Sequence, residues 1–226
     1  MPRFLILRLD GPMQAWGTHT YEDFRPSNLF PTRSGLLGLL GGCLGIDRQD
    51  LAELERLAAS VEFAVRVDRE ALRPEVVAPA PRSGVKLPDF HTVLAARKVD
   101  GSANKNPVVS RREYLFDAAF TVAVGERATA SISLDALAEA LRRPRFTPVL
   151  GRRSCPITRP LLEAGPIEAA DALAALAGVM PRGGITYTEG DFVSDQPMQI
   201  RDVPLHGRHR QFGTRRIHVH KEGPCS

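Results

Sequence analysis

The sequence predicts an α+β fold built from two β-α-β units with a long excursion between them. Residues 4–9 are almost all apolar, which is typical of a central strand covered on at least one face. Residues 61–67 alternate as a half-buried strand does, and residues 115–124 form a long, mostly apolar third strand. With helical segments between these strands, the order is that of a ferredoxin-like domain, the split βαβ arrangement.

The first helix is expected to begin near residues 31–34 and to continue through a glycine-rich body, residues 35–45. Each glycine costs about 1 kcal/mol relative to alanine in a helix. Close packing of the backbone against a sheet or another chain would offset that cost. A glycine-rich loop is the alternative, which the periodic leucines disfavour. Asp47 and Asp50 can cap a second helix, and Ser133 a third.

The remaining segments complete the first domain, which we expect at residues 1–150. Residues 147–150 are the expected fourth strand. The excursion at residues 72–113 contains several prolines and little periodicity, and an insertion of this length inside a compact domain is usually functional or disordered. We expect it to be a thumb that projects between the second and third strands.

The second region, residues 151–226, is expected to be a smaller β-rich domain that begins with a Gly-Arg-Arg turn. A short helix is expected at residues 166–176, and strands at residues 184–188 and 216–220.

Composition restricts the class of protein. Of the 226 residues, 43% are hydrophobic and 25% are charged, and no apolar run reaches the roughly 20 residues that span a bilayer. Arg8 and Asp10 interrupt the first apolar run, so we expect no signal peptide. Cys43, Cys155 and Cys225 contain no CxxC pair, which disfavours a disulfide framework and a zinc site. We therefore expect a cytoplasmic protein with no membrane partner and no cofactor.

Cationic side chains are concentrated in three stretches, residues 82–112, 142–160 and 201–221. These stretches hold nineteen of the thirty Lys and Arg residues and only three acids, so they carry +16. Because the net charge is +4, the remainder carries −12. Clustered cations favour a polyanion such as RNA or DNA, since each neutralised phosphate releases counterions. Solvated, disordered basic loops are the alternative.

Six sequence strings carry a family resemblance that runs from Arg3 to about Lys221. They are residues 11–17 (GPMQAWG), 30–41 (FPTRSGLLGLLG), 91–97 (HTVLAAR), 112–115 (REYL), 150–156 (LGRRSCP) and 210–212 (RQF). Taken in order, this set resembles the CasD family, which binds the 5′ handle of CRISPR RNA (crRNA) in the type I-E effector complex, Cascade.

The resemblance implies a repeat-associated mysterious protein (RAMP) fold whose thumb folds over the crRNA and displaces a nucleotide. It implies one copy per complex, at the crRNA 5′ end, beside a backbone (CasC-type) subunit and the large (CasA-type) subunit that reads the PAM. Target DNA would be reached only indirectly, through the complex. The sequence departs from the family at the thumb tip, residues 98–109, and at residues 222–226.

Basic residues at two turns are the first candidates for RNA binding. Arg33 and Ser34 stand where a helix begins, and free N–H groups there favour an anion. N-capping by Thr32 or Ser34 is the alternative. In the Gly-Arg-Arg-Ser turn, glycine lets the backbone approach a phosphate, and the guanidinium groups of Arg152 and Arg153 suit phosphate geometry. A surface salt-bridge pair is the alternative there.

The thumb places cations between aromatic rings, which suits single-stranded RNA because bases stack and phosphates are neutralised. Phe90 could instead form a small local core. For Trp16 and Tyr114, buried packing is the commoner role. Gln14, on the loop that leaves the first strand, is a candidate donor to RNA. The thumb candidates are Lys86, His91, Arg97, Arg111 and Arg112.

Four histidines near the C-terminus resemble a metal cluster, but the arginines around them disfavour a divalent ion. We expect an RNA- or protein-facing basic surface there instead. The histidines are His206, His209, His218 and His220. The predicted RNA-binding set is Gln14, Arg33, Ser34, Lys86, His91, Arg97, Arg111, Arg112, Tyr114, Arg152, Arg153, Arg208 and Arg210, with no catalytic residue and no metal ligand.

A non-catalytic RNA-binding scaffold is the function that these features favour. The handle would be read through base edges and stacking, and the rest of the RNA through phosphates. A metal-independent endoribonuclease that processes crRNA precursors is the alternative. It needs a general base and a general acid, which His19, His91, Tyr21 and Lys86 could supply. The charge distribution disfavours a purely protein-binding scaffold.

Overall fold

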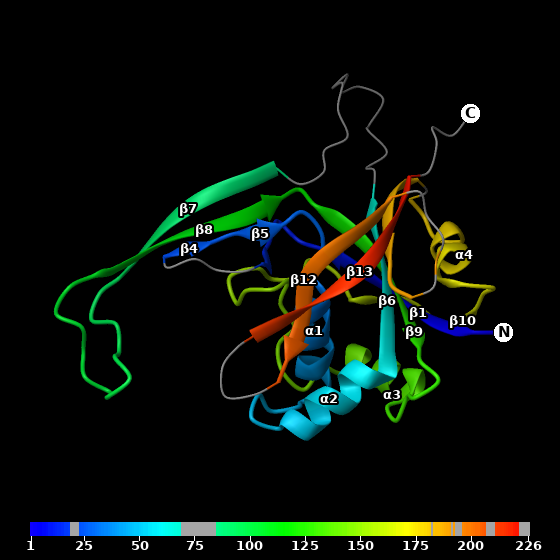
Figure 1. Cartoon of the computed structure of the whole chain (residues 1–226), viewed down its shortest axis with the longest axis horizontal. Helices are drawn as coiled ribbons and strands as arrows, with labels where there is room; N and C mark the ends of the chain where they lie inside the picture. The colour runs from blue at the N-terminus through cyan, green and yellow to red at the C-terminus, as the bar shows by residue number, and fades with distance from the viewer. Residues whose placement is uncertain are drawn as a thin grey trace, which may run out of the picture.

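The computed structural model describes residues 1–18, 23–68, 85–181, 183–190, 192, 196–206 and 211–221. Its body is a sheet of seven antiparallel strands in the order β10-β1-β9-β6-β11-β13-β12 (Figure 1). The strands are β1 (Arg3–Asp10), β6 (Val61–Asp68), β9 (Ala119–Glu126), β10 (Leu162–Glu168), β11 (Gly184–Thr188), β12 (Pro197–Leu205) and β13 (Gln211–Lys221).

The order β10-β1-β9-β6 places the first strand of the unit between the fourth and the third, as the split βαβ arrangement requires. β1 pairs with β9 from Phe4↔Gly125 to Asp10↔Ala119 without a register shift. This pairing of strands that are distant in sequence confirms the predicted α+β fold class.

The fourth strand is β10, so the prediction of that strand at residues 147–150 is wrong. Pro148 has no N–H for a ladder, and the N–H of Leu150 donates to the carbonyl of Cys155 (2.8 Å) within the following turn. The segment contributes only the isolated bridge Val149↔Pro156. Because β10 lies beyond residue 150, the expected domain boundary falls inside the four-stranded unit.

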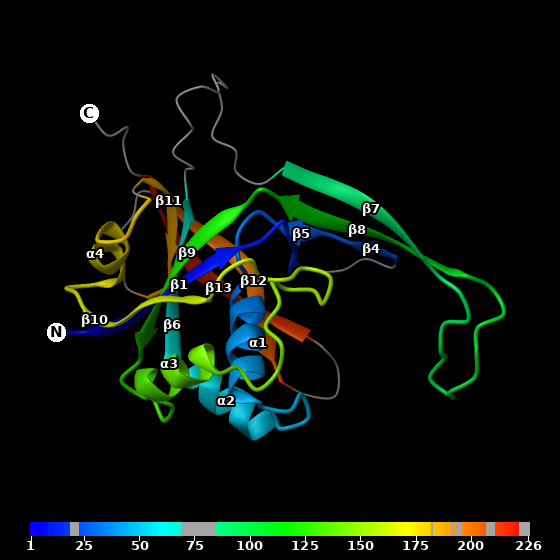
Figure 2. The ribbon, with the colours of Figure 1, turned by 180° about the vertical axis from the view of Figure 1, so that it is seen from behind.

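Helices cover both faces of this sheet (Figures 1 and 2). Leu5 and Leu7 of β1 pack into the larger core, whereas Phe4 and Ile6 pack into a smaller core with α4. This two-sided burial explains why β1 is almost continuously apolar. The helices are α1 (Arg33–Leu44), α2 (Leu51–Ser60), α3 (Leu134–Arg142) and α4 (Ala172–Ala177). No helix in the described ranges is long and apolar enough to cross a membrane.

The predicted helix starts are confirmed for the first three helices. The side chains of Thr32, Asp50 and Ser133 accept from backbone N–H groups in the first turns of α1, α2 and α3. The short helix predicted at residues 166–176 begins later, at Ala172. Residues 166–168 belong instead to β10, which pairs with β1.

A second sheet forms an arm that projects from the body (Figures 1 and 2). β8 pairs with β7 along one edge, and with the short strands β2 and β4 along the other. The predicted thumb is therefore a β-hairpin, and its first part, residues 72–84, lies outside the described residues. The strands are β2 (Met13–Gln14), β4 (Phe24–Arg25), β7 (Val85–Val93) and β8 (Val108–Phe116), with a separate pair formed by β3 (Trp16–Gly17) and β5 (Ser27–Asn28).

The third strand predicted at residues 115–124 is divided between β8 and β9. Asp117 has a left-handed backbone (φ 51°) and turns the chain between the arm and the central sheet. Asp117 is the one charged residue in residues 115–124, and the apolar residues on both sides of it predicted a single strand.

The C-terminal strands extend the central sheet rather than form a sheet of their own. β11 pairs with β6, and β13 and β12 follow. The strand predicted at residues 184–188 is confirmed, and the one predicted at residues 216–220 lies within the longer β13. We did not predict β12, which begins with Pro197 and contains Pro204.

Candidate nucleic-acid interface

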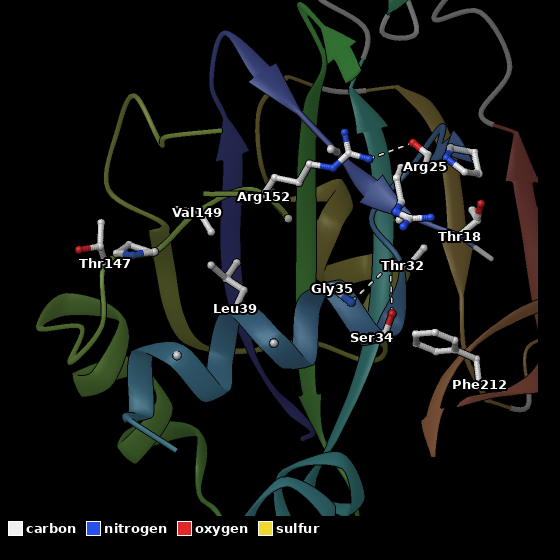
Figure 3. A pocket seen from close by; sticks show the side chains of 17 residues that line it. Thr18, Arg25, Thr32, Ser34, Gly35, Leu39, Thr147, Val149, Arg152 and Phe212 are labelled. Carbon is white, nitrogen blue, oxygen red and sulfur yellow. Dashed lines mark hydrogen bonds between the residues drawn. The ribbon is translucent and has the colours of Figure 1, made fainter. Parts of the chain in front are cut away.

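A cleft of about 500 Å³ lies between α1, the segment before the Gly-Arg-Arg turn and the base of the arm (Figure 3). It is lined by Ala15, Gly17, Thr18, Arg25, Pro26, Thr32, Ser34, Gly35, Gly38, Leu39, Gly42, Thr147, Pro148, Val149, Gly151, Arg152 and Phe212. This described lining holds two arginines and no carboxylate, so it suits an anionic ligand.

The glycines of α1 form one side of the cleft. A Cβ atom added at Gly38 or Gly42 would meet nothing within 4 Å, so both leave the helix backbone open to a ligand. At Gly35, by contrast, an added Cβ would lie 2.8 Å from the ring of Trp16. The predicted close packing therefore holds at Gly35, whereas Gly38 and Gly42 face the open cleft.

The Gly-Arg-Arg turn is fixed against the opposite side of the cleft. Gly151 has φ +87°, and a Cβ atom there would lie 1.8 Å from the carbonyl oxygen of Ala15. The N–H of Ala15 donates to the carbonyl of Leu150 (3.0 Å). Only glycine fits this position, and it sets where the two following arginines stand.

Arg152 connects the turn to the arm. Its guanidinium lies 4.7 Å from the ring centre of Tyr114 and donates to the carbonyls of Glu113 and Arg25, both at 2.9 Å. Two of its donors are thus used inside the protein, although it lines the cleft. Arg153 is exposed, and it makes no ion pair with any residue that the structure describes. Of the two, Arg153 is the freer to bind a phosphate.

Tyr114 and His91 form a polar group next to Arg152. The Tyr114 hydroxyl lies 3.2 Å from His91 Nε2 and 3.4 Å from Ser154 Oγ. His91 Nε2 is also 2.8 Å from the carboxylate of Asp89. The arm and the turn therefore meet through Tyr114, which follows one cationic stretch, and through Arg152 and Ser154, which lie in another.

The arm divides its predicted RNA-binding residues between two faces. Side chains alternate along β7 and β8, and register partners share a face. His91, Arg112 and Tyr114 lie on the face that meets Arg152, which we call the inner face. Lys86 and Arg111 lie on the opposite, outer face. Lys86 also pairs with Glu113 there (3.0 Å).

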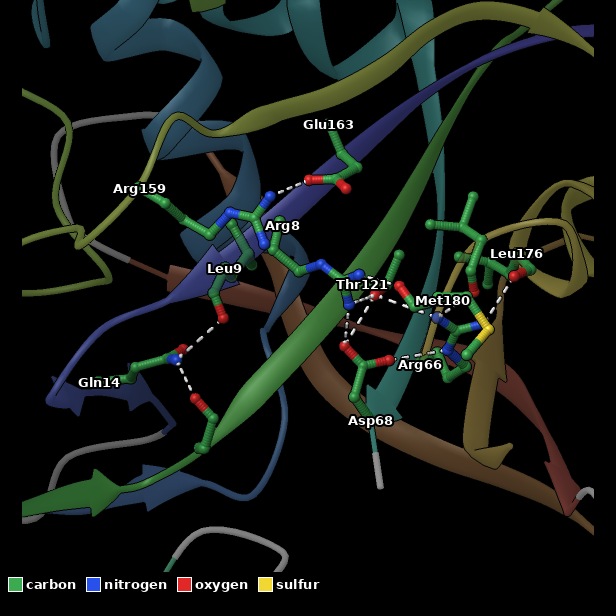
Figure 4. A network of polar contacts seen from close by, with 12 residues as sticks. Arg8, Leu9, Gln14, Arg66, Asp68, Thr121, Arg159, Glu163, Leu176 and Met180 are labelled. Carbon is green, nitrogen blue, oxygen red and sulfur yellow. Dashed lines mark hydrogen bonds and ion pairs between the residues drawn. The ribbon is translucent and has the colours of Figure 1, made fainter. Parts of the chain in front are cut away.

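Gln14 is fully buried, so the prediction that it donates to RNA is wrong (Figure 4). Its amide donates to the carbonyls of Leu9 (3.1 Å) and Ala118 (2.6 Å), and its oxygen accepts from the indole of Trp16 (3.0 Å). It joins the end of β1 to the start of β9 and positions the tryptophan beneath α1.

Arg33 is also buried, with 5% of its surface exposed, and is not available to RNA. Its guanidinium pairs with Glu189 and donates to the carbonyls of Ala58 (2.7 Å) and Val61 (3.1 Å). The anion expected at the helix start is the protein's own Asp202, which accepts from the backbone N–H of Arg33 at 2.7 Å. Asp202 stands far away in sequence, so no local pattern could show that it occupies this position.

The remaining predicted residues are dispersed. Ser34 is half-buried at the edge of the cleft, and Arg97 is exposed at the tip of the arm. Arg208 and Arg210, like His19, Tyr21 and His209, lie outside the described residues. Sequence analysis missed Arg25 and Phe212 in the cleft lining. The string at residues 210–212 contained Phe212, but nothing in the sequence pointed to Arg25.

One of the two histidines on β13, His220, contacts a side chain of the neighbouring strand β11. His220 Nε2 lies 3.0 Å from Thr188 Oγ1, and burial, followed by the charge of His218, lowers the pKa of His220. No group of three or more His, Cys, Asp or Glu side chains in the described segments is arranged to hold a metal.

The fold and the cleft define a ferredoxin-like protein that presents a cationic groove and a projecting hairpin. A family model described as "CRISPR-associated protein (Cas_Cas5)" matches residues 4–218, and the chain belongs to this family. It is 46% identical over 225 residues to "CRISPR system Cascade subunit CasD" of Escherichia coli (strain K12), covering 99% of this chain and 98% of that protein.

Two solved structures share the fold. One chain of a structure titled "CRISPR RNA-guided surveillance complex" superposes with a TM-score of 0.75 at 30% identity, covering 96% of this chain and 89% of that one. A "Crystal structure of Cas protein" gives a TM-score of 0.60 at 29% identity, covering 97% and 93%. The predicted resemblance to CasD is confirmed.

Proposed function

We propose that this chain is a CasD-type subunit of Cascade that binds the 5′ handle of crRNA without cutting it. The observation that carries the proposal is the junction of the arm and the Gly-Arg-Arg turn at Tyr114 and Arg152. That junction joins two of the three cationic stretches into one surface beside a cleft with no carboxylate in its described lining. The near full-length similarity to the E. coli subunit supports the assignment.

Each part of this surface suits one component of single-stranded RNA. Arg112 and Arg153 make no ion pair within the described part of the chain and would neutralise phosphates. The open backbone at Gly38 and Gly42 would admit a ribose or a base close to α1. His91 offers a ring and a polar atom on the inner face. The handle would thus run from the inner face of the arm into the cleft.

Scaffolding fits the geometry better than cleavage. Of the four acid–base candidates, only His91 and Lys86 are described, and register places them on opposite faces of the arm. A cleavage site needs its base and acid on either side of one phosphate. Lys86 is held by Glu113 (3.0 Å), away from the inner face. A CasC-type backbone subunit and a CasA-type large subunit are the proposed protein partners, and target DNA would be reached through them.

Co-purification with repeat-containing RNA tests the proposal. We expect the wild-type chain to retain an uncut fragment whose sequenced 5′ end is the handle. Arg112→Ala with Arg153→Ala should retain less of it. Arg56→Ala is the matched control, since it removes an exposed arginine of α2 that pairs with Glu53, outside the cleft. Cut RNA that depends on His91, or equal retention by all variants, would refute the proposal.

A further inference from the structure

The outer face of the arm carries a row of side chains that the proposed cleft does not use. Phe90 on β7 pairs in register with Arg111 on β8, and Arg111 pairs with Phe24 on β4. Register partners in a sheet share a face. Phe90, Arg111 and Phe24 therefore form one row across three strands, with the cation between the two rings.

The row is open to solvent, and its cation has no acidic partner among the described residues. Phe90 is 62% exposed, Phe24 is 37% exposed, and Arg111 is also exposed. Within the described residues Arg111 makes no side-chain ion pair. The acid nearest in register on this face, Glu113, already accepts from Lys86 and from the N–H of Ser27, both at 3.0 Å. Two exposed rings beside an unneutralised guanidinium form an interaction surface.

We infer that this row is a stacking platform for unpaired nucleobases of a second stretch of single-stranded nucleic acid. Exposed rings on a sheet face stack bases without regard to sequence, because every base has a π-face. Strands lie about 4.8 Å apart, so the two rings stand far enough apart to receive two splayed bases. Arg111, between them, would contact the phosphate that joins those bases.

A β-strand from a partner protein would pair poorly with β7, the edge strand of the arm. Pro88 has no N–H, and the N–H of Phe90 donates to the carboxylate of Asp89 (2.8 Å). A partner strand added to β7 would therefore miss two donors. Residues 85–116 also hold six Lys and Arg against three acids, which favours an anionic partner.

The inference goes beyond the proposed function, because the handle would occupy the inner face and the cleft. The test uses the full chain loaded with handle RNA. A labelled oligouridine or oligothymidine of about 15 nucleotides, without the handle sequence, is then titrated in. We expect Phe90→Ala and Phe24→Ala each to weaken this second binding about fivefold or more, with handle RNA retained. Val93→Ala, on the inner face of the same strand, is the matched control and should leave this second binding unchanged.

A fluorescence reporter gives an independent reading. The chain has one tryptophan, Trp16, which is fully buried, so Phe90→Trp adds an exposed reporter on the platform. A stacked base should quench its emission, and comparing the two oligonucleotides shows whether the platform takes RNA, DNA or both.

The outcomes separate this inference from the proposed function. No second binding while handle RNA is retained would overturn the platform alone. Loss of handle RNA binding with quenching preserved would overturn the proposed function alone. A blue shift without quenching, seen only when the other Cascade subunits are added, would show that the row is a protein interface and would overturn the platform.

Discussion

The interior of this protein and the surface beside its cleft both hold arginines, but the two sets differ in what surrounds them. Arg8 and Arg66 are buried, and both bind Asp68 at 2.7–2.8 Å (Figure 4). Arg112 and Arg153 are partly or fully exposed and make no ion pair in the described part of the chain. An arginine in the sequence therefore marks a polyanion site only where the fold supplies no acid of its own.

The same contrast divides the three cationic stretches. The arm and the Gly-Arg-Arg turn meet at Tyr114 and Arg152. In the C-terminal stretch, Arg215 binds both oxygens of Asp202 (2.6 and 2.7 Å) and also pairs with Glu189 (2.9 Å). Its charge serves to hold β13 to its neighbours. The net charge of a stretch thus overstates how many of its cations are available to bind RNA.

The largest effect is expected from Asp68→Ala. This carboxylate accepts from Arg8, Arg66 and Thr121, so its loss leaves two buried guanidinium groups without their anion. We expect the free energy of unfolding to fall by about 3–5 kcal/mol, measured by urea denaturation. Asp135→Ala is the control, because its pair with Arg3 is exposed and should contribute little to stability. Equal losses of unfolding free energy in the two variants would contradict the distinction between buried and exposed ion pairs.

Gly151→Ala should have the next largest effect. A Cβ atom at φ +87° would press on the carbonyl oxygen of Ala15, which is backbone and cannot rotate away. We expect about 2–4 kcal/mol of destabilisation and weaker RNA retention, since the turn sets the positions of both arginines. Gly38→Ala is the matched control: it adds the same methyl group inside α1 where nothing lies within 4 Å, so it should keep or raise stability. A Gly151→Ala variant as stable as the wild type would contradict the fixed turn.

Arg152→Ala and Arg153→Ala should separate positioning from phosphate binding. Arg152 donates to two carbonyls and covers Tyr114, so its loss should cost about 1–3 kcal/mol of stability. Arg153→Ala should leave stability within about 0.5 kcal/mol but reduce the salt dependence of RNA binding by about 0.7 in the log–log slope. Binding isotherms at several salt concentrations measure this. An unchanged slope for Arg153→Ala would show that it does not contact phosphate.

The smallest expected effect is a pH dependence from His220. Burial, followed by the charge of His218, lowers its folded pKa below the ordinary 6.5. Between the folded and unfolded pKa values the unfolded chain binds more protons, so stability falls as pH decreases below about 6.5. His220→Gln should flatten the curve of unfolding free energy against pH in that window. A curve that keeps its slope in the variant would assign the dependence to another group.

Local patterns predicted most of the fold. Side-chain caps such as Asp50 and Ser133, and the alternation in β6, depend on residues close in sequence. Errors arose where the outcome depends on distant partners. Residues 147–150 have the apolar character of a strand, but the carbonyl of Leu150 accepts from the N–H of the distant Ala15, and its N–H donates to Cys155 in the following turn.

The candidate site could be predicted only in part, for the same reason. The Gly-Arg-Arg turn meets Tyr114 and, through it, His91, and Arg112 shares their face by register. That these residues bind RNA stays a prediction. The predictions for Arg33 and Gln14 were wrong, because both residues are buried against groups that lie far away in the sequence. Solvent exposure depends on the folded chain, so a basic or polar residue in a sequence motif does not indicate whether its side chain is exposed.

Ultraviolet cross-linking of the chain loaded with handle RNA, followed by mass spectrometry of the peptides, tests most directly whether the arm and the turn form one RNA surface. We predict cross-linked peptides from both the inner face of β7 and β8, around His91 and Arg112, and the turn at Arg153. Cross-links confined to one of these segments, or found instead on α2 and α3, would contradict the account.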